Sequence, residues 1–304
     1  MAATATNSPR ILLLGAGGQL GMVLKQRLSV QSELTSLTRA ELDFSNVDAV
    51  REAVRTARPD IVVNAAAYTA VDKAESEPEL CGLVNGVAPG VIAEEVAKTG
   101  GWLIHYSTDY VFDGSGTTPW VETDRTGPLG VYGQTKLDGE LAIASTGCQH
   151  VTMRTSWVYA EQGRNFLHTM LRLGRERELL KIVDDQIGAP TTAEAITEAT
   201  LAVLAHISSG EAGSASGTYH LTCSGQASWC DFAKAIFAEF AGRQKAPEVT
   251  GIPSEAYPTP AKRPKNSRLN CEKFATQFGY RMPEWQDALA EVAARMLAVE
   301  SKAV

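Results

Sequence analysis

Short apolar runs alternate with helical patterns over about the first 155 residues, and this alternation constrains the fold most strongly. The apolar runs cover residues 11–14, 34–37, 61–63 and 102–106. The helical patterns cover residues 19–28, 46–55 and 78–98, and another begins near residue 132. Such apolar runs are typical of strands that are buried on both faces of a sheet. Because parallel strands need helical crossovers, the order predicts an α/β fold with a doubly wound, Rossmann-type parallel sheet.

The second half of the chain is less regular. After Asn165 the spacing of apolar residues changes, and several prolines interrupt it. These prolines are Pro190, Pro253, Pro258, Pro260 and Pro264. We expect a first domain over residues 1–160 and a smaller domain over 161–304, with some elements of the C-terminal half returning to the first domain.

Charge and cysteine usage exclude several classes of protein. The chain carries 28 Lys and Arg against 35 Asp and Glu, a net charge of −7, which is unfavourable for binding to nucleic acid or an anionic membrane. Its five cysteines are dispersed without a C-x-x-C pair, which favours a reducing compartment. No apolar leader is visible over residues 1–10, and no run approaches the roughly 18 apolar residues that span a membrane. We therefore expect a cytoplasmic protein.

A glycine-rich turn follows the first predicted strand. Gly15, Gly18 and Gly21 form a G-x-x-G-x-x-G pattern that opens the first helix. Without Cβ atoms, the backbone can turn tightly and approach a pyrophosphate at a helix N-terminus. The position of the turn after a strand and before a helix predicts a dinucleotide site that includes Gln19 and Leu20.

The end of the second predicted strand bears on the choice of dinucleotide. Many dinucleotide-binding folds place an acid there, where it holds the ribose 2′-hydroxyl. Here the chain has Arg39, which could accept a 2′-phosphate, although Glu41 lies nearby. The pattern favours NADPH, with NADH possible.

Hydroxyl and amine groups that suit carbonyl reduction cluster around the fourth predicted strand. Ser107 and Thr108 end that strand, where ligands of open α/β sheets bind. Tyr132 and Lys136 are one helical turn apart, so they share a helix face. Either hydroxyl could orient a carbonyl, and an ammonium beside Tyr132 would lower the pKa of the phenol. Tyr132 would then act as a general acid near neutral pH.

Other conspicuous residues have simpler interpretations. We interpret His105, inside the fourth apolar run, as a core or cofactor-cleft residue without a catalytic role. Asp184 and Asp185 are adjacent acids without a His or Cys at ligand spacing, so we predict no metal there. The apolar stripe over 229–240 has helical spacing and predicts packing.

Four stretches give the chain a resemblance to a known family, in addition to the glycine turn and the Tyr-x-x-x-Lys pair. They cover residues 63–75, 107–114, 185–191 and 262–269. Together these patterns resemble the extended short-chain dehydrogenase/reductase superfamily and, within it, the dTDP-4-dehydrorhamnose reductases. The first and last stretches are the more specific ones.

The resemblance implies roles for matching positions. Asp43 would meet the adenine, and Lys136 would also bond the nicotinamide ribose. The residues that would line the cofactor cleft are Asn64, Ala65, Ala66 and Tyr68. The residues that would contact the deoxysugar are Asp109, Tyr110 and Trp157, while Arg263 would hold the nucleotide diphosphate. Thr108, Tyr132 and Lys136 would form the catalytic triad.

The same resemblance implies a reaction. It is the reduction by NAD(P)H of the 4-keto group of dTDP-4-dehydro-6-deoxy-L-mannose to dTDP-L-rhamnose, for cell-surface polysaccharide. A homodimer with magnesium at its contact stays an option. Two alternatives remain open: a nucleotide-sugar epimerase or dehydratase, and a non-catalytic regulatory subunit. The intact Thr108, Tyr132 and Lys136 argue against the regulatory subunit.

Overall fold

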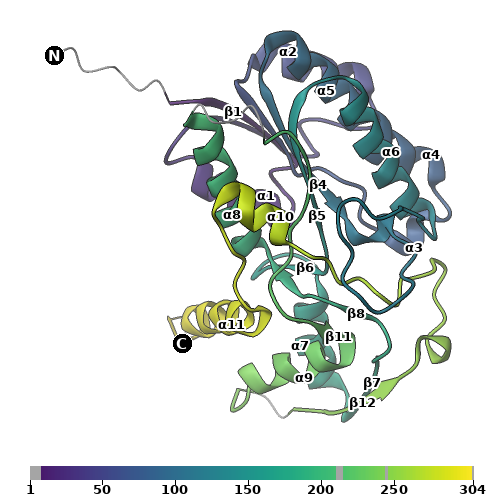
Figure 1. The fold of residues 1–304 in the computed structure, drawn as a ribbon. Coiled ribbons are helices and arrows are strands. Elements are labelled where there is room, and N and C mark those ends of the chain that lie inside the picture. Colours follow the sequence, from purple (N-terminus) through teal and green to yellow (C-terminus); the bar gives the residue numbers. More distant parts are fainter. Residues whose placement is uncertain (1–7, 210–214, 244–245, 303–304) are drawn as a thin grey trace.

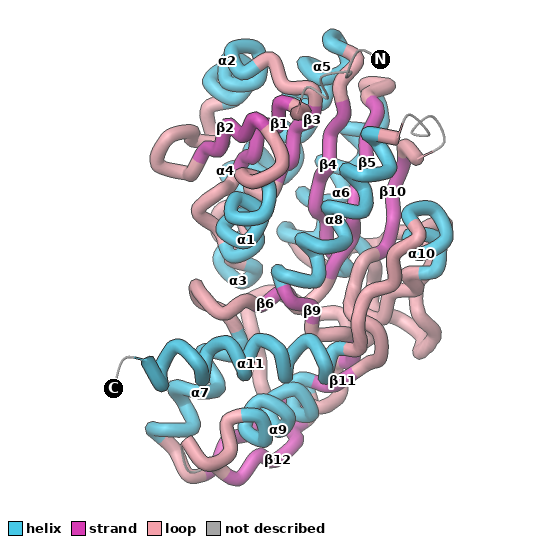
Figure 2. The backbone as a smooth tube through the Cα atoms, turned by 90° about the vertical axis from the view of Figure 1, so that its left-hand side faces the viewer, coloured by secondary structure: helices cyan, strands magenta, loops and turns pink. Residues whose placement is uncertain are grey.

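A computed structural model describes residues 8–209, 215–243 and 246–302. Its centre is a six-stranded parallel sheet in the order β10-β5-β4-β3-β1-β2 (Figures 1 and 2). The strands are β1 (Arg10–Leu14), β2 (Glu33–Leu37), β3 (Ile61–Asn64), β4 (Trp102–Thr108), β5 (Gln149–Thr155) and β10 (Gly217–His220). The predicted doubly wound α/β fold is therefore confirmed.

Each face of the sheet has its own hydrophobic core. On β1, Ile11 and Leu13 belong to one core, and Leu12 and Leu14 belong to the other. The first core is covered by α1 (Gln19–Leu28) and α8 (Ala193–Ser208), with α10 (Glu272–Phe278) beside α8. The second is covered by α2 (Val47–Ala57), α5 (Ala88–Thr99) and α6 (Val131–Ser145). Because the sheet is covered on both sides, its strands read as continuous apolar runs.

The helix predicted over 78–98 contains a π-helical turn. Helix α4 (Pro78–Gly82), the π turn η1 (Leu83–Val87) and α5 follow one another, and Gly100 ends the run at φ 69°. An 18-residue window within Pro78–Thr99 has a mean hydropathy of 1.3, which suffices for a membrane helix by length and composition alone. The apolar runs of the sequence did not predict such a segment. In the fold 61% of that window is buried, and α5 packs between α2 and α6, so the apolar residues serve the core.

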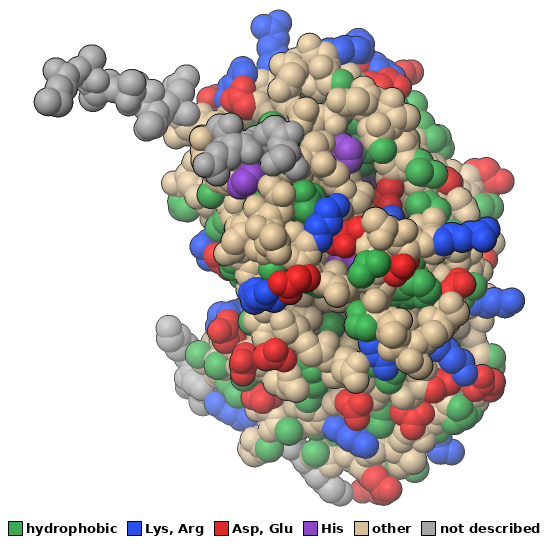
Figure 3. Space-filling view, viewed as in Figure 1, with side chains coloured by type: hydrophobic (Ala, Val, Ile, Leu, Met, Phe, Trp, Pro, Cys, Tyr) green, Lys and Arg blue, Asp and Glu red, His purple; other side chains and the backbone are tan. Residues whose placement is uncertain are grey.

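The remaining elements gather mainly at the carboxyl end of the sheet, in the lower part of Figure 1. The strand pairs there are β6 (Val158–Tyr159) with β9 (Thr191–Thr192), β7 (Leu179–Val183) with β12 (Glu248–Ile252), and β8 (Ile187–Gly188) with β11 (Ala227–Ser228). The helices are α7 (Phe166–Glu176), α9 (Trp229–Glu239) and α11 (Trp285–Lys302). Short helical turns are α3 (Val71–Ala74), η2 (Asp109–Val111) and η4 (Ser254–Ala256). Figure 3 shows acidic and basic side chains interspersed over one face of the molecule.

Two local predictions can be compared directly with the structure. Asn46 caps α2 as expected, because its side chain accepts a hydrogen bond from the Ala49 amide at 3.0 Å. The β-rich run predicted over 151–158 is not one strand. β5 ends at Thr155, and Trp157 has a left-handed backbone at φ 49°, which turns the chain before β6. A positive φ is a strained conformation for a bulky side chain, and such strain is concentrated at functional sites.

The glycine turn depends on two close backbone approaches. A Cβ on Gly15 would lie 2.5 Å from the amide nitrogen of Ala66, and its φ is 81°. A Cβ on Gly21 would lie 2.1 Å from the carbonyl oxygen of Gly15. Glycine is therefore required at position 15 for the turn to approach the loop after β3, and at position 21 for α1 to approach the turn.

We predict that Gly21→Ala destabilises the fold by about 1–3 kcal/mol, because the added methyl group overpacks rigid backbone. Gly17→Ala is the matched control, since its Cβ would meet only the Thr38 side chain, at 3.6 Å. It should leave stability unchanged or raise it slightly. Urea unfolding of the two variants measures the difference, and equal midpoints would contradict this account of the turn.

Candidate active site

The carboxyl end of β4 and the first turn of α6 bring the predicted catalytic residues together. Thr108 ends β4, and Tyr132 is the second residue of α6. Tyr132 forms a side-chain hydrogen bond with Thr108, and its ring meets that of Tyr110 edge-on, with centroids 5.6 Å apart. Lys136 follows one turn later and is 2% exposed. A phenol, a hydroxyl and an amine therefore lie together at the edge of the sheet where ligands of open α/β folds bind.

The pKa of Tyr132 differs from the prediction. We expected Lys136 to lower it, but in the structure burial raises the pKa of Tyr132 well above its ordinary value. The hydrogen bond with Thr108 opposes this rise only in part. The physical reason is that desolvation disfavours the phenolate, while the Lys136 amine is engaged elsewhere.

The Lys136 amine is held by β4. Its Nζ donates a hydrogen bond to the carbonyl oxygen of Tyr106 at 2.6 Å and lies 3.3 Å from Nε2 of His105. Burial lowers the pKa of Lys136 to about 8, and the charge of Glu140, one turn along the same helix, opposes this shift. The amine is thus close to changing charge near neutral pH.

Glu140 anchors α6 to two strands of the sheet. Its carboxylate accepts hydrogen bonds from Arg154 on β5, with Nη2 2.6 Å from Oε2, and both side chains are buried. It also accepts a hydrogen bond from the hydroxyl of Ser107. Neighbouring residues of a strand point to opposite sides, so Ser107 faces this ion pair while Thr108 faces Tyr132. The structure therefore leaves Thr108 as the hydroxyl beside the phenol.

Asp109 is the most unusual acid of the site. It is 2% exposed, and its Oδ2 has no hydrogen-bond partner among the described residues, whereas Oδ1 accepts from the Thr108 hydroxyl at 3.1 Å. Burial raises the pKa of Asp109 to about 6, and hydrogen bonds with Ser267 and Thr108 oppose this rise. A buried oxygen without a partner beside the phenol is suited to a polar ligand.

A hollow of about 410 Å³ lies at the glycine turn. Its lining includes seven residues predicted for the cofactor: Gly15, Gly18, Arg39, Asp43, Ala65, Ala66 and Tyr68. Glu41 is not part of this lining, because its carboxylate accepts hydrogen bonds from the amide and hydroxyl of Thr38, both at 2.8 Å. Arg39 is the exposed cation there and has no hydrogen bond or ion pair within the described part of the chain.

Four predicted cofactor residues lie outside this lining. The side chain of Gln19 accepts a hydrogen bond from Asn165 at 2.8 Å, and Leu20 packs against the hydrophobic core. Gly21 packs against Gly15. The side chain of Asn64 is 1% exposed and bonds the Ala66 amide and His105. The sequence pattern located the loop but could not distinguish backbone contacts from side-chain contacts.

A second hollow, of about 610 Å³, lies between α3, α7, β7 and the loop after η4. Arg263 lines it and is paired with Asp72, with Nη2 2.9 Å from Oδ2. The aromatic wall is Trp229, whose ring stacks on Trp157 at a centroid distance of 3.6 Å. The helical spacing of the stripe beginning at Trp229 predicted packing. No sequence pattern gave Asp72 a role of its own. A tryptophan at the first turn of an amphipathic helix was the available signal for this wall.

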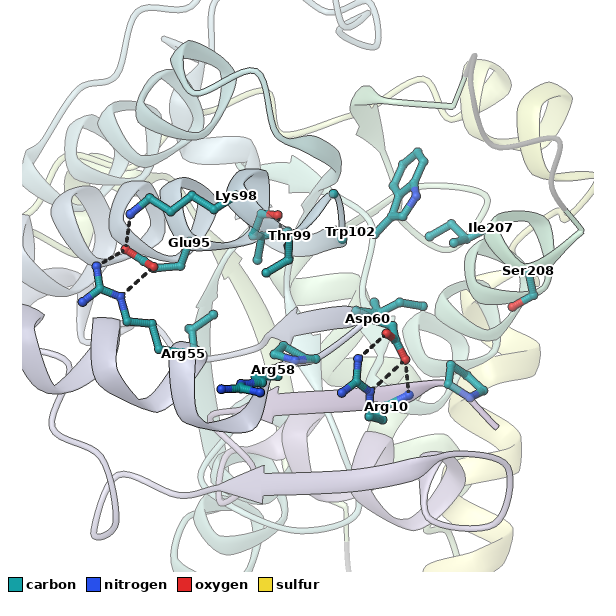
Figure 4. Close-up of a pocket in the computed structure, with 17 residues that line it drawn as sticks. Arg10, Arg55, Arg58, Asp60, Glu95, Lys98, Thr99, Trp102, Ile207 and Ser208 are labelled. Atoms are coloured by element: carbon teal, nitrogen blue, oxygen red, sulfur yellow. Dashed lines mark hydrogen bonds and ion pairs between the residues drawn. The ribbon is translucent and has the colours of Figure 1, made fainter. Parts of the chain in front are cut away.

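A third hollow, of about 860 Å³, lies at the opposite end of the sheet (Figure 4). Its lining includes two ion-pair groups, Arg10 with Asp60 and Arg55 with Lys98 around Glu95. None of the predicted site residues lines it. This hollow is therefore separate from the candidate site at the carboxyl end of β4.

The adjacent acids Asp184 and Asp185 do not form a metal site in the structure. Asp185 pairs with Lys265 at 2.9 Å and accepts a hydrogen bond from the Ser254 hydroxyl at 2.6 Å. Across the described ranges, no group of three His, Cys, Asp or Glu residues is arranged to hold a metal ion.

Comparison with known proteins identifies the family. The model of the RmlD substrate binding domain matches residues 9–298. The chain is 48% identical to the dTDP-4-dehydrorhamnose reductase of Escherichia coli K12 over 285 residues, which cover 91% of this chain and 94% of the relative. It is 47% identical to the dTDP-4-dehydrorhamnose reductase of Burkholderia thailandensis, and the match covers 92% of this chain and 96% of the relative. The chain belongs to the dTDP-4-dehydrorhamnose reductase family.

Solved structures of this reductase family share the fold. The dTDP-4-dehydrorhamnose reductase of Clostridium acetobutylicum gives a TM-score of 0.86 at 36% identity and covers 94% of this chain and 99% of its own. The reductase of Bacillus anthracis, in complex with NADP, also gives a TM-score of 0.86, at 32% identity. It covers 95% of this chain and 99% of its own. A UDP-glucose 4-epimerase of Thermus thermophilus gives 0.79 at 18% identity, with 95% and 99% covered, a likeness of fold alone.

We predict that Asp109→Asn stabilises the fold at neutral pH by about 1–3 kcal/mol. The folded-state pKa of Asp109 is about 6 against an ordinary value of 3.8, so ionisation is harder in the folded state. Stability is therefore lost as pH rises from about 4 to 6, and the asparagine variant avoids this loss.

The measurement is urea unfolding at the two ends of this pH window. Asp113→Asn is the control, because hydrogen bonds from Ser115 lower the pKa of this exposed acid, so its variant should gain no stability with rising pH. If Asp109→Asn gained the same stability at both pH values, burial would not be what destabilises the fold when Asp109 ionises.

Proposed function

We propose that the protein reduces the 4-keto group of dTDP-4-dehydro-6-deoxy-L-mannose with NADPH and so forms dTDP-L-rhamnose. The carrying observation is the convergence of Thr108, Tyr132 and Lys136 where the carboxyl end of β4 meets the start of α6. Identity of 48% and 47% to curated reductases supports this activity. The rhamnose would serve polysaccharide synthesis, and a 37% identical relative is the spore coat polysaccharide biosynthesis protein SpsK of Bacillus subtilis. All five cysteines are free thiols, which is compatible with a cytoplasmic enzyme.

The hollow at the glycine turn fits a phosphate-bearing dinucleotide. Gly18 is the N-cap of α1 and offers no side chain to cap it, which leaves backbone N–H groups of the first turn to a ligand. A Cβ on Gly18 would meet only the Gly15 carbonyl oxygen, at 3.4 Å, so the ligand side of the turn is open. Arg39 would hold the 2′-phosphate, and Asp43 would meet the adenine. The Bacillus anthracis reductase binds NADP, which supports NADPH here.

When bound, NADPH supplies the hydride that reduces the C4 carbonyl. Tyr132 then donates its phenolic proton to the C4 oxygen, and Thr108 holds that oxygen by a hydrogen bond. The raised pKa of Tyr132 keeps the phenol protonated until it is needed. As a cation, Lys136 favours the phenolate that remains after proton transfer.

The second hollow would hold the nucleotide sugar. We divide the chain into a cofactor-binding part over 1–160, joined by returning elements such as β10, and a mainly substrate-binding part over 161–304. Asp109, Tyr110 and Trp157 would contact the sugar, and Trp229 would add an aromatic surface. Arg263 would hold the diphosphate once it releases Asp72. No feature of the described residues favours the epimerase or the regulatory subunit over this reaction.

We predict that Tyr132→Phe lowers kcat by about 100- to 10,000-fold, because the general acid is lost. The assay follows oxidation of NADPH with dTDP-4-dehydrorhamnose generated by the two upstream enzymes. Tyr159→Phe is the matched control, since that hydroxyl is buried and has no hydrogen-bond partner among the described residues. Full activity in folded Tyr132→Phe would refute the assignment of the acid.

We predict that Arg39→Asn weakens binding of NADPH by about 10- to 100-fold, because a charge-assisted contact with the 2′-phosphate is lost. Binding of NADH should change less than about twofold. Arg58→Asn at the opposite end of the sheet is the control, because asparagine tolerates the left-handed backbone of that position (φ 43°). Titration by protein fluorescence measures both affinities, and equal losses for the two dinucleotides would exclude a 2′-phosphate contact.

A further inference from the structure

A buried chain of polar contacts connects the catalytic helix to the loop after β3. His105 is fully buried on β4, beside Asn64 on β3. Nδ1 of His105 lies 3.1 Å from Nδ2 of Asn64, and its Nε2 lies 3.3 Å from Nζ of Lys136. The contacts run from the Ala66 amide through Asn64 and His105 to Lys136.

The hydrogen bonds of Asn64 determine which nitrogen of His105 carries the proton. The Ala66 amide donates to Oδ1 of Asn64 at 3.1 Å, so the carboxamide NH₂ group must face His105. Nδ1 of His105 is then an acceptor without a proton, and the ring proton is on Nε2, which faces Lys136. A second proton at Nδ1 would face the NH₂ group of Asn64. Burial and the charges of Lys136 and His150 also lower the pKa of His105 well below its ordinary value, which disfavours a doubly protonated ring.

This tautomer acts on the charge of Lys136. Two N–H donors that face each other repel, so a donor at Nε2 favours the neutral amine, which can accept its proton. The amine still donates to the Tyr106 carbonyl oxygen. An ammonium at Lys136 escapes this repulsion only if the ring proton moves to Nδ1 and the Asn64 amide flips, which breaks the bond from the Ala66 amide. The Nε2 tautomer therefore lowers the pKa of Lys136 without forbidding its charged form.

We propose that His105 and Asn64 are positioning residues that hold Lys136 and couple its charge to the backbone of the loop over residues 65–68. Ala66 lines the hollow at the glycine turn. A ligand that reorients this loop would break the bond from the Ala66 amide to Asn64, so that the ring proton of His105 could move to Nδ1. The charged form of Lys136 would then be favoured. The other ionisable groups that act on Lys136 are Glu140 from α6, which favours its charge, and Cys81 from α4. The role in catalysis rests on the proposed function, whereas the tautomer does not.

The first test is the ¹⁵N spectrum of the histidine rings in the free, labelled protein. The proposal expects His105 to carry its proton on Nε2 throughout the neutral range. A proton on Nδ1 would overturn it. Assignment is made by loss of the signal in His105→Gln. Because this measurement needs neither substrate nor turnover, it stands even if the proposed reaction is wrong.

The second test uses the pH profile of kcat. The ammonium of Lys136 is lost as pH rises through its pKa, so the rate should fall on the alkaline side. Asn64→Ala frees the ring to accept from Lys136, and His105→Gln can offer a carbonyl acceptor. Both substitutions should raise, by about one pH unit, the pH at which kcat falls on the alkaline side of the profile (the alkaline limb).

Thr152→Val is the control for both variants. Thr152 is the register partner of His105 on β5, it is buried, and its hydroxyl has no partner among the described residues. This variant should leave the limb in place. An alkaline limb that stays at the wild-type position in both Asn64→Ala and His105→Gln, with kcat reduced, would show a purely structural role and overturn the proposal.

Discussion

The buried ion pair between Glu140 and Arg154 is the interaction on which the geometry of the candidate site depends. It ties α6, which carries Tyr132 and Lys136, to β5, and the Ser107 hydroxyl ties the same carboxylate to β4. Removing one partner of a buried pair leaves an uncompensated charge and typically costs about 3–5 kcal/mol. The part of α6 that carries Tyr132 and Lys136 is therefore held against the strand ends by charge as well as by packing.

The same arrangement places titratable groups in dry surroundings. Tyr132, Asp109, Lys136 and His105 are all shifted toward their neutral forms, because burial disfavours charge. In the free protein the phenol thus stays protonated, and the amine loses its charge just above neutral pH. We infer that a bound ligand changes the charge of these groups by replacing or excluding water around them.

The sequence predicted the architecture because its signals are local. The glycine turn, the Asn46 cap and the Tyr132–Lys136 spacing each fix a short segment, and strand periodicity fixes the sheet. The contacts of His105, the direction of Ser107 and the pairing of Arg263 with Asp72 depend on residues far apart in the chain. The sign of the Tyr132 pKa shift was predicted wrongly, because spacing along a helix does not show how deeply a phenol is buried. Trp229 was missed as a wall of the second hollow, because helical spacing alone indicates packing.

The most direct measurement is the transfer of deuterium from NADPH labelled at C4 of the nicotinamide to the nucleotide sugar. The account predicts one deuterium at C4 of the sugar in each product molecule, with one oxidised cofactor released per turnover, as mass spectrometry would detect. An unlabelled sugar product with the cofactor unchanged would contradict it and would point to internal oxidation and reduction of a single bound sugar.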